Sequence, residues 1–263
     1  MGDGKALQAG TSHNLGQNFA KAFEIRYLDS TGVLQYCWTT SWGLSTRFVG
    51  AIIMVHGDDQ GLILPPRLAP HQLVIVPIYK TDDEKNSVME AARKLRAGLV
   101  EAGVRVKMDE RDGLSPGFKF NDWEMRGVPL RMELGPKDVA KGSVVLARRD
   151  KPGKEGKSFV PQQGIAEAVK KSLEEIQKAL FDRALAFRKA NTAEPADYAE
   201  FKLAVEKGFA FSWWCGSADC EEKIKAETKA TMRCIPLEQP GGEGNCIFCA
   251  RASREKAIFS RAY

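Results

Sequence analysis

The chain has 263 residues, of which 43% are hydrophobic and 28% charged, and its formal net charge is +5. This composition is typical of a soluble globular protein with room for two or three domains. No stretch approaches the roughly 18 consecutive apolar residues of a membrane helix, and the first residues lack a secretory signal, so we expect a cytoplasmic protein with no membrane partner. Residues 71–160 hold eighteen basic and fourteen acidic side chains. This excess fits either a polyanionic partner or a solvated surface.

Residues 1–70 alternate short β-type runs with turns and predict an antiparallel sheet. The runs at 24–28 and 33–39 enclose turn residues and indicate a hairpin. A second pair of strands is predicted at 49–55 and 62–64, around a turn at 56–61, and the following two prolines end the region. These strands are too few to enclose a core, so we expect that further sequence belongs upstream.

Residues 73–150 predict a small α/β domain. A continuous apolar strand at 73–79 is suited to burial on both faces. Thr81 or Asp82 can cap the next helix, whose apolar residues recur every three or four positions, and Gly103 is placed to end it. Further strands are expected at 104–108, 128–134 and 144–147.

The segment 150–157 has the composition of a turn or exposed loop. A long amphipathic helix follows, marked by apolar residues from Ile165 to Phe187. Pro195 and Asp197 start a further short helix, and Gly208 leads into a tail rich in aromatic residues and cysteine.

Five of the six cysteines lie in the last fifty residues. Without a secretion signal, such clustering favours metal binding over disulfides. Two pairs, Cys215 with Cys220 and Cys246 with Cys249, have spacings that suit a tetrahedral zinc site. Two alternatives stay open at this point: five reduced thiols without metal, or a site in which Cys234 replaces one ligand.

Several long segments together carry a family resemblance. The run 40–50 (TSWGLSTRFVG) with 56–67, and the upstream run 8–19 (QAGTSHNLGQNF), resemble motif 3 and the amino-acid pocket of class II prolyl-tRNA synthetases. The resemblance continues through 116–124 and 135–138 to the last residue. It implies an α/β and α+β multidomain chain: a partial antiparallel class II catalytic sheet at 1–70, a mixed-sheet anticodon-binding domain at 71–160, and a small zinc-binding domain at 161–263.

The same resemblance implies ligands for the amino-terminal segment. Activation joins the proline carboxylate to the α-phosphate of ATP, and a positioned arginine on a rigid strand stabilises the charge that builds on phosphate oxygens. ATP would be bound by Gln8, Thr11, Ser45 and Arg47, with Mg²⁺ accompanying ATP as substrate, and His13 would line the proline pocket. Ser45 stands where the family often has threonine, and the hydroxyl is kept. We expect no acid, base or nucleophile among these residues.

For the middle domain the resemblance implies contact with the anticodon of the proline tRNA. A carboxylate can accept hydrogen bonds from guanine N1–H and N2–H₂, and cations can reach O6 and N7. Glu124, Arg131 and Lys137 would take these roles, and Phe118 would stack or shape the site. Phe120 and Trp123 are expected in the core.

In the tail, the resemblance assigns a structural zinc ion to Cys215, Cys220, Cys246 and Cys249. The terminal Tyr263 would pack back toward the active site.

The expected function is therefore ATP-dependent attachment of proline to its tRNA, by a full-length homodimeric ligase. This chain alone, possessing none of the earlier class II motifs, is expected to be inactive and monomeric. One alternative is a non-catalytic module that binds tRNA, and another is a zinc-stabilised scaffold unrelated to RNA.

Overall fold

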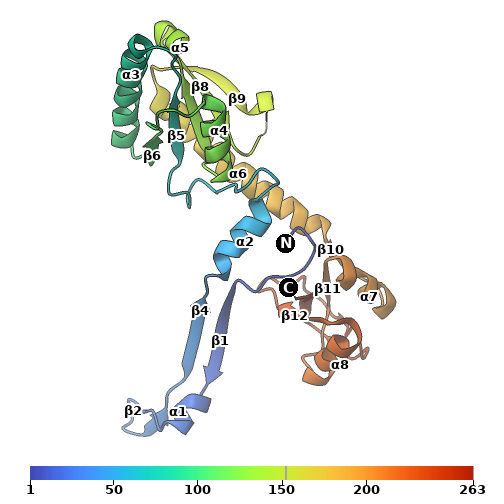
Figure 1. Ribbon diagram of the computed structural model, residues 1–263. Coiled ribbons are helices and arrows are strands. Elements are labelled where there is room, and N and C mark those ends of the chain that lie inside the picture. Colours follow the sequence, from blue (N-terminus) through green and yellow to red (C-terminus); the bar gives the residue numbers. More distant parts are fainter. Residues whose placement is uncertain (152, 263) are drawn as a thin grey trace. The chain divides into compact units, whose positions relative to one another are not determined.

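The computed structural model describes residues 1–151 and 153–262, so the expectation for Tyr263 lies outside the described residues. The chain divides into two compact units, one of Ile52–Lys189 and one of Met1–Ala51 with Ala190–Tyr263 (Figure 1). Both contain helices and sheets, which confirms a mixed α/β multidomain chain. The predicted domain boundaries at 70/71 and 160/161 stay a prediction.

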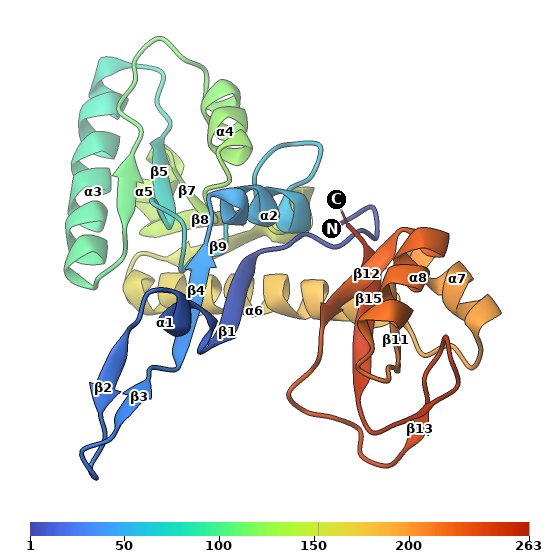
Figure 2. The same cartoon turned by 90° about the horizontal axis from the view of Figure 1, so that it is seen from below.

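A two-stranded antiparallel ribbon is the longest paired element of the first 51 residues. Strands β1 (Gly10–Gly16) and β4 (Thr39–Leu44) pair along their length. Between them lie helix α1 (Asn18–Ala22) and the hairpin of β2 (Arg26–Leu28) and β3 (Leu34–Tyr36), seen at the end of the ribbon in Figure 2. The predicted hairpin and antiparallel pairing are confirmed. Most apolar side chains here are exposed, including Phe23, Trp42 and Leu44 at 71%, 73% and 77%.

The predicted strand at 49–55 is wrong, because this segment lies in helix α2 (Arg47–His56). Its β-branched residues favour a strand, but a continuous apolar run cannot distinguish strand from helix by its periodicity. The Ser45 hydroxyl accepts a hydrogen bond from the Arg47 N–H at 3.3 Å as the helix begins. The predicted turn is confirmed by reciprocal backbone bonds between Asp58 and Gly61, but the residues at 62–64 form no strand.

The unit Ile52–Lys189 is built on a five-stranded sheet of order β6-β5-β7-β8-β9. Strands β5 (Leu73–Pro77), β6 (Val106–Met108) and β7 (Leu130–Leu134) are parallel. Strands β8 (Ser143–Arg148) and β9 (Lys157–Pro161) continue the sheet antiparallel. Most of these strands were predicted. β9 was not, because its first residue was taken as the end of a loop that includes the short helix η1 (Gly153–Gly156).

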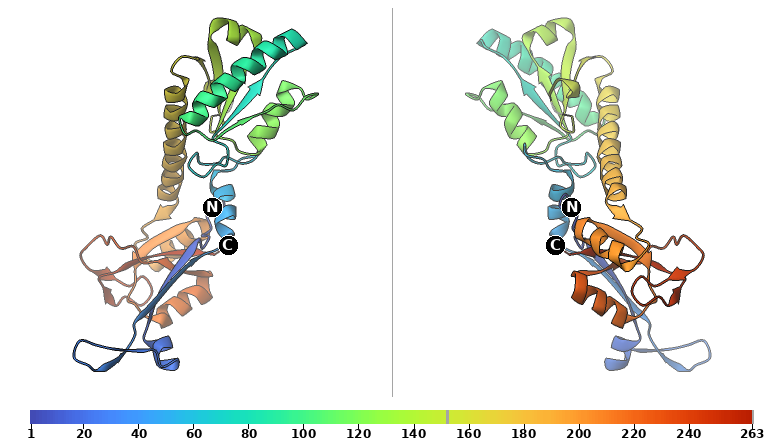
Figure 3. Two further views of the ribbon diagram at one scale, coloured as in Figure 1. Left: turned by 90° about the vertical axis from the view of Figure 1, so that its left-hand side faces the viewer. Right: turned by 90° about the vertical axis from the view of Figure 1, so that its right-hand side faces the viewer.

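Helices cover the two faces of this sheet unequally. Helices α3 (Asp82–Glu101), α5 (Pro136–Lys141) and α6 (Ile165–Ala190) accompany one face. Among the described residues, only α4 (Pro116–Met125) covers the other, where Trp123 packs on Val74 and Val76. Figure 3 shows α6 in gold and α4 in light green on opposite sides of the sheet. Within the part of the chain that the structure describes, no second helix packs on this face towards β8 and β9.

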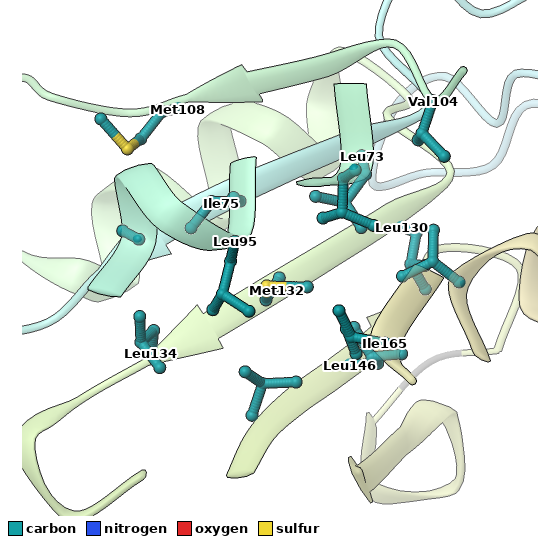
Figure 4. Packing of buried hydrophobic residues seen from close by; sticks show 14 of the residues in the cluster. Leu73, Ile75, Leu95, Val104, Met108, Leu130, Met132, Leu134, Leu146 and Ile165 are labelled. Carbon is teal, nitrogen blue, oxygen red and sulfur yellow. The ribbon is translucent and has the colours of Figure 1, made fainter. Parts of the chain in front are cut away.

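The main core lies between the sheet and α3 with α6. Leu73 and Ile75 of β5 meet Leu130 and Met132 of β7 there, all of them fully buried (Figure 4). Burying a side chain of this size contributes about 1.5–3 kcal/mol. Thr81 caps α3 by accepting from the Glu84 N–H, and the positive φ of 84° at Gly103 ends the turn after it. The predicted long amphipathic helix is confirmed as α6.

The carboxy-terminal part of the other unit forms a four-stranded sheet of order β10-β11-β15-β12. The elements in chain order are β10 (Thr192–Ala193), α7 (Tyr198–Lys207), β11 (Phe209–Trp213), α8 (Ala218–Thr228), β12 (Ala230–Cys234), β13 (Gly244–Asn245), β14 (Ala252–Ser253) and β15 (Lys256–Arg261). Asp197 caps α7 as predicted. Phe201 and Phe259 centre the core of this part. Among the described residues, no helix has the length and apolar character to cross a membrane.

Candidate nucleic-acid interface and metal centre

Two of the predicted anticodon residues are in direct contact. The Arg131 guanidinium donates to the Glu124 carboxylate at 2.5 Å and to Glu133 at 3.0 and 3.2 Å. It lies 4.1 Å over the ring of Phe120. Arg131 is 7% exposed, whereas Glu124 is half-buried at the end of α4. Arg131 therefore fixes the carboxylate of Glu124, and Glu124 remains open to a ligand.

The other two predicted anticodon residues lie elsewhere on this unit. Phe118 is 53% exposed in the first turn of α4, and Lys137 is exposed in the first turn of α5, after the opposite end of β7. Within 1–151 and 153–262, no hydrogen bond or ion pair joins either residue to Glu124 or Arg131. Phe120 and Trp123 pack against Val74 and Val76, which confirms them as core residues.

A second carboxylate, that of Asp109, binds α4 through Trp123, the residue before Glu124. The Asp109 side chain is fully buried and accepts from the Trp123 indole at 2.8 Å and from Arg111 at 2.9 and 2.7 Å. Burial alone would raise the pKa of Asp109, but these hydrogen bonds outweigh it and lower the pKa to about 2. A hollow of about 380 Å³ adjoins these residues and is also lined by Arg126.

The four cysteines predicted as a set come together. The sulfur atoms of Cys215, Cys220, Cys246 and Cys249 all lie within 4.8 Å of one another. The separations from Cys215 to Cys220 and to Cys249 are 3.6 and 3.7 Å. A disulfide needs about 2.05 Å, whereas a tetrahedron with Zn–S bonds of about 2.3 Å has sulfurs roughly 3.8 Å apart.

Local backbone geometry presents these thiols. Gly216, at φ 76°, turns the chain after Cys215, and Ala250, at φ 59°, closes a turn in which its N–H donates to the Cys246 carbonyl. Burial raises the pKa of Cys220 to about 12, whereas the Arg251 N–H lowers that of Cys249 to about 7. Cys234 lies outside the group, exposed at the end of β12. The arrangement fits a tetrahedral ion with four thiolates, such as Zn²⁺.

The residues predicted to bind ATP gather where the β1–β4 ribbon ends. The Gln8 amide donates to the Thr11 hydroxyl at 2.7 Å, and Arg47 donates to the Gln8 carbonyl at 3.4 Å. Arg47 is the first residue of α2, so its predicted position on a strand is wrong. His13 is exposed on β1, two residues after Thr11 and therefore on the same face of the ribbon.

Sequence reasoning missed the ionic partners of the predicted site. Glu133 holds both Arg131 and Lys157, with contacts of 2.8 and 3.0 Å to the lysine. Recognising the contact between Lys157 and Glu133 would have required a prediction of β9. This strand aligns Lys157 beside Ala147, which is itself opposite Arg131. The β-favouring pair Phe159 and Val160, which lies between Gly156 and Pro161, is the signal that could have revealed the strand.

Comparison with known proteins agrees with this arrangement. Residues 72–172 match the family model of the anticodon binding domain. Residues 198–263 match the model described as prolyl-tRNA synthetase, C-terminal. The first match defines the class, a protein with an anticodon-binding domain.

Relatives named proline–tRNA ligase align with the whole chain. Identity is 58% with that of Chloroflexus aggregans, 57% with that of Roseiflexus sp. and 51% with the chloroplastic/mitochondrial ligase of Arabidopsis thaliana. The alignments cover 55%, 55% and 49% of these relatives, so the chain spans about half of their length. The chain belongs to the class II prolyl-tRNA synthetase family and corresponds to a carboxy-terminal portion.

Proposed function

We propose that this chain is the anticodon-reading and metal-stabilised portion of an ATP-dependent proline–tRNA ligase. The observation that carries the proposal is that an anticodon-binding domain and a prolyl-type C-terminal domain occur in one chain whose whole length is 58% identical to a proline–tRNA ligase. The proposed partner is the anticodon loop of the proline tRNA, in which guanine is the informative base.

Glu124 is the proposed reader of guanine. Its carboxylate is held by Arg131 and stays half-exposed. An ionised carboxylate is acceptor-only and suits the N1–H and N2–H₂ donors of guanine. Because Arg131 is buried between two carboxylates, we assign it mainly to the orientation of Glu124. Lys137 is exposed and free to reach phosphate or base atoms, and Phe118 offers an exposed ring.

The amino-terminal ribbon is proposed as part of the catalytic domain. Gln8, Thr11, Ser45 and Arg47 would bind ATP with its Mg²⁺, and His13 would face the proline. The exposed apolar side chains of this segment support an origin in a larger, antiparallel class II sheet that covers them. The same exposure argues against the alternative of a free-standing tRNA-binding module. The full-length enzyme would be a homodimer, and we expect this chain alone to form no prolyl-adenylate.

The cysteine group is proposed to hold structural Zn²⁺. Four protein thiolates complete a tetrahedron and leave no position for a reactive water. The ion would join Cys215 and Cys220, which flank the start of α8, to the turn at 246–249 beside the core of this part.

Binding of an anticodon stem-loop RNA tests the proposal. Glu124→Ala and Lys137→Ala should each weaken binding about 5- to 100-fold, since a good base contact contributes about 1–3 kcal/mol. Glu101→Ala and Lys94→Ala, exposed residues on α3, are the matched controls and should leave the dissociation constant unchanged. Equal affinity of all four variants and the parent chain would refute the anticodon assignment and favour a scaffold unrelated to RNA.

A further inference from the structure

Phe159 is an exposed aromatic residue in the middle of a strand. It lies on β9, the outer strand of the five-stranded sheet, and its side chain is 78% exposed. Among the described residues it belongs to neither core of this unit, whereas its neighbour Val160 packs against the main one. A solvent-exposed aromatic residue on an edge strand favours aggregation. Its presence here is explained if a binding partner covers it.

Strand register places Phe159 on the same face as the candidate anticodon site. Phe159 is opposite Val145 on β8, and Val145 is opposite Glu133 on β7. Side chains directly opposite one another share a face of the sheet. This is the face that α4 covers only in part, and it also carries Arg131.

Neighbouring strands lie about 4.8 Å apart, so Phe159 is roughly 10 Å from Glu133 across the sheet. Glu133 in turn contacts the guanidinium that holds Glu124. One short unpaired loop can therefore present one base to Glu124 and another to the ring of Phe159.

The charges around the ring fit a polyanion. Residues 71–160 carry eighteen basic and fourteen acidic side chains. Lys151 and Lys154 are exposed in the loop that leads into β9, and Lys157 lies two residues before Phe159 on the same face. An open aromatic ring beside cations is the arrangement that proteins use to stack bases of single-stranded nucleic acid. Lys157 is already paired with Glu133, but an apolar protein partner would not account for the exposed Lys151 and Lys154.

We propose that Phe159 is a stacking platform for an unpaired base of the RNA loop that Glu124 reads. The inference rests on the proposed function and adds a specific contact to it: a base adjacent to the one at Glu124 lies on the ring, and its backbone phosphate is neutralised by the lysines before β9. Glu124 distinguishes guanine from other bases, whereas Phe159 adds binding energy by stacking on a base of any kind.

The test compares Phe159→Ala and Phe159→Trp in the full 263-residue chain, with fluorescent stem-loop RNA carrying a proline anticodon. Phe159→Ala should weaken binding roughly 5- to 100-fold, the range for loss of one stacked base. Phe159→Trp should restore it. Phe181→Ala removes a ring that is 63% exposed on α6 and is the control, with no expected change. Thermal unfolding should match the parent chain in all three, because the side chains are exposed.

A set of RNAs, each with a single abasic site, distinguishes the loss of one stacking contact from a general loss of RNA affinity. At one loop position, removal of the base should weaken binding of the RNA to the parent chain. The same removal should not weaken its binding to Phe159→Ala any further, because that variant has already lost the stacking contact. Unchanged affinity of Phe159→Ala, or a loss that is the same on every abasic RNA, would overturn the inference. Altered self-association with unchanged RNA binding would overturn it too and assign the ring to protein contact. Glu124→Ala reports on the proposed function separately: if it has no effect while Phe159→Ala does, anticodon reading fails and stacking survives.

Discussion

The guanidinium of Arg149 holds the carboxylate of Asp58 through two hydrogen bonds, of 2.9 and 2.5 Å. Arg149 is almost fully buried, whereas the Asp58 side chain is 43% exposed. The same guanidinium donates to the Glu124 carbonyl at 3.0 Å. The pair therefore ties the turn after α2 to the end of α4 that carries the proposed anticodon reader.

This asymmetric burial predicts an asymmetric response to mutation. Asp58→Ala leaves the buried guanidinium of Arg149 without its carboxylate partner. It should lower the free energy of unfolding by about 2–4 kcal/mol. Arg149→Met leaves a carboxylate that water can reach and should cost about 1–2 kcal/mol. Urea unfolding followed by circular dichroism measures both, with the exposed neighbour substitution Asp59→Ala as control. A larger loss for Arg149→Met than for Asp58→Ala would contradict this account of the pair.

Asp109 predicts a pH dependence of stability. Its folded-state pKa is about 2, below the ordinary 3.8, so the ionised form is stabilised by folding. This contribution, about 2 kcal/mol, is fully present above pH 4 and is lost as the pH falls from 3.8 through 2. Hydrogen bonds from Arg149 lower the pKa of Asp58 as well. Part of the stability that is lost at acid pH therefore comes from the pair of Asp58 and Arg149.

The substitution Asp109→Asn separates the two contributions. It keeps the size of the side chain but removes the titration, so the variant should lose less stability than the parent between pH 4 and pH 2.5. Chemical unfolding at a series of pH values supplies the comparison. Parallel curves for parent and variant would show that Asp109 does not titrate as described.

Metal removal should destabilise the carboxy-terminal sheet selectively. Cys246 is buried in the core that includes Phe201 and Phe259. Loss of the ion should therefore loosen the packing of that core. We expect one zinc per chain by mass spectrometry, and its loss in Cys246→Ser with a lower unfolding temperature. Cys234→Ser, outside the group, should keep both the zinc content and the unfolding temperature. Equal zinc loss in the two variants would rule out the four-cysteine assignment.

The sequence predicts best where local chemistry and periodicity agree. The cap at Thr81, the glycine stop at 103 and the apolar side of α6 all follow from residues close together in the chain, and each is confirmed. The segment 49–55 shows the opposite case, because an apolar, β-branched run has the same pattern in a strand and a buried helix.

The candidate sites show the same division. The four cysteines could be grouped from their spacing, because paired ligands on turns form a local pattern. The contact between Lys157 and Glu133 could not, since it depends on pairing between β7, β8 and the unpredicted β9. Burial of Arg131, which changes its proposed role from reader to orienting residue, is likewise visible only in the folded chain.

The most direct measurement is the affinity of the parent chain for two stem-loop RNAs that differ only in the anticodon. One carries the two guanines of a proline anticodon, and the other has cytosines in their place. Guanine offers the two adjacent donors N1–H and N2–H₂ to the carboxylate proposed as its reader, whereas cytosine offers only N4–H₂. At one fixed salt concentration we therefore predict binding to the first RNA at least tenfold tighter. Equal affinity for the two loops would contradict the assignment of this chain as an anticodon reader.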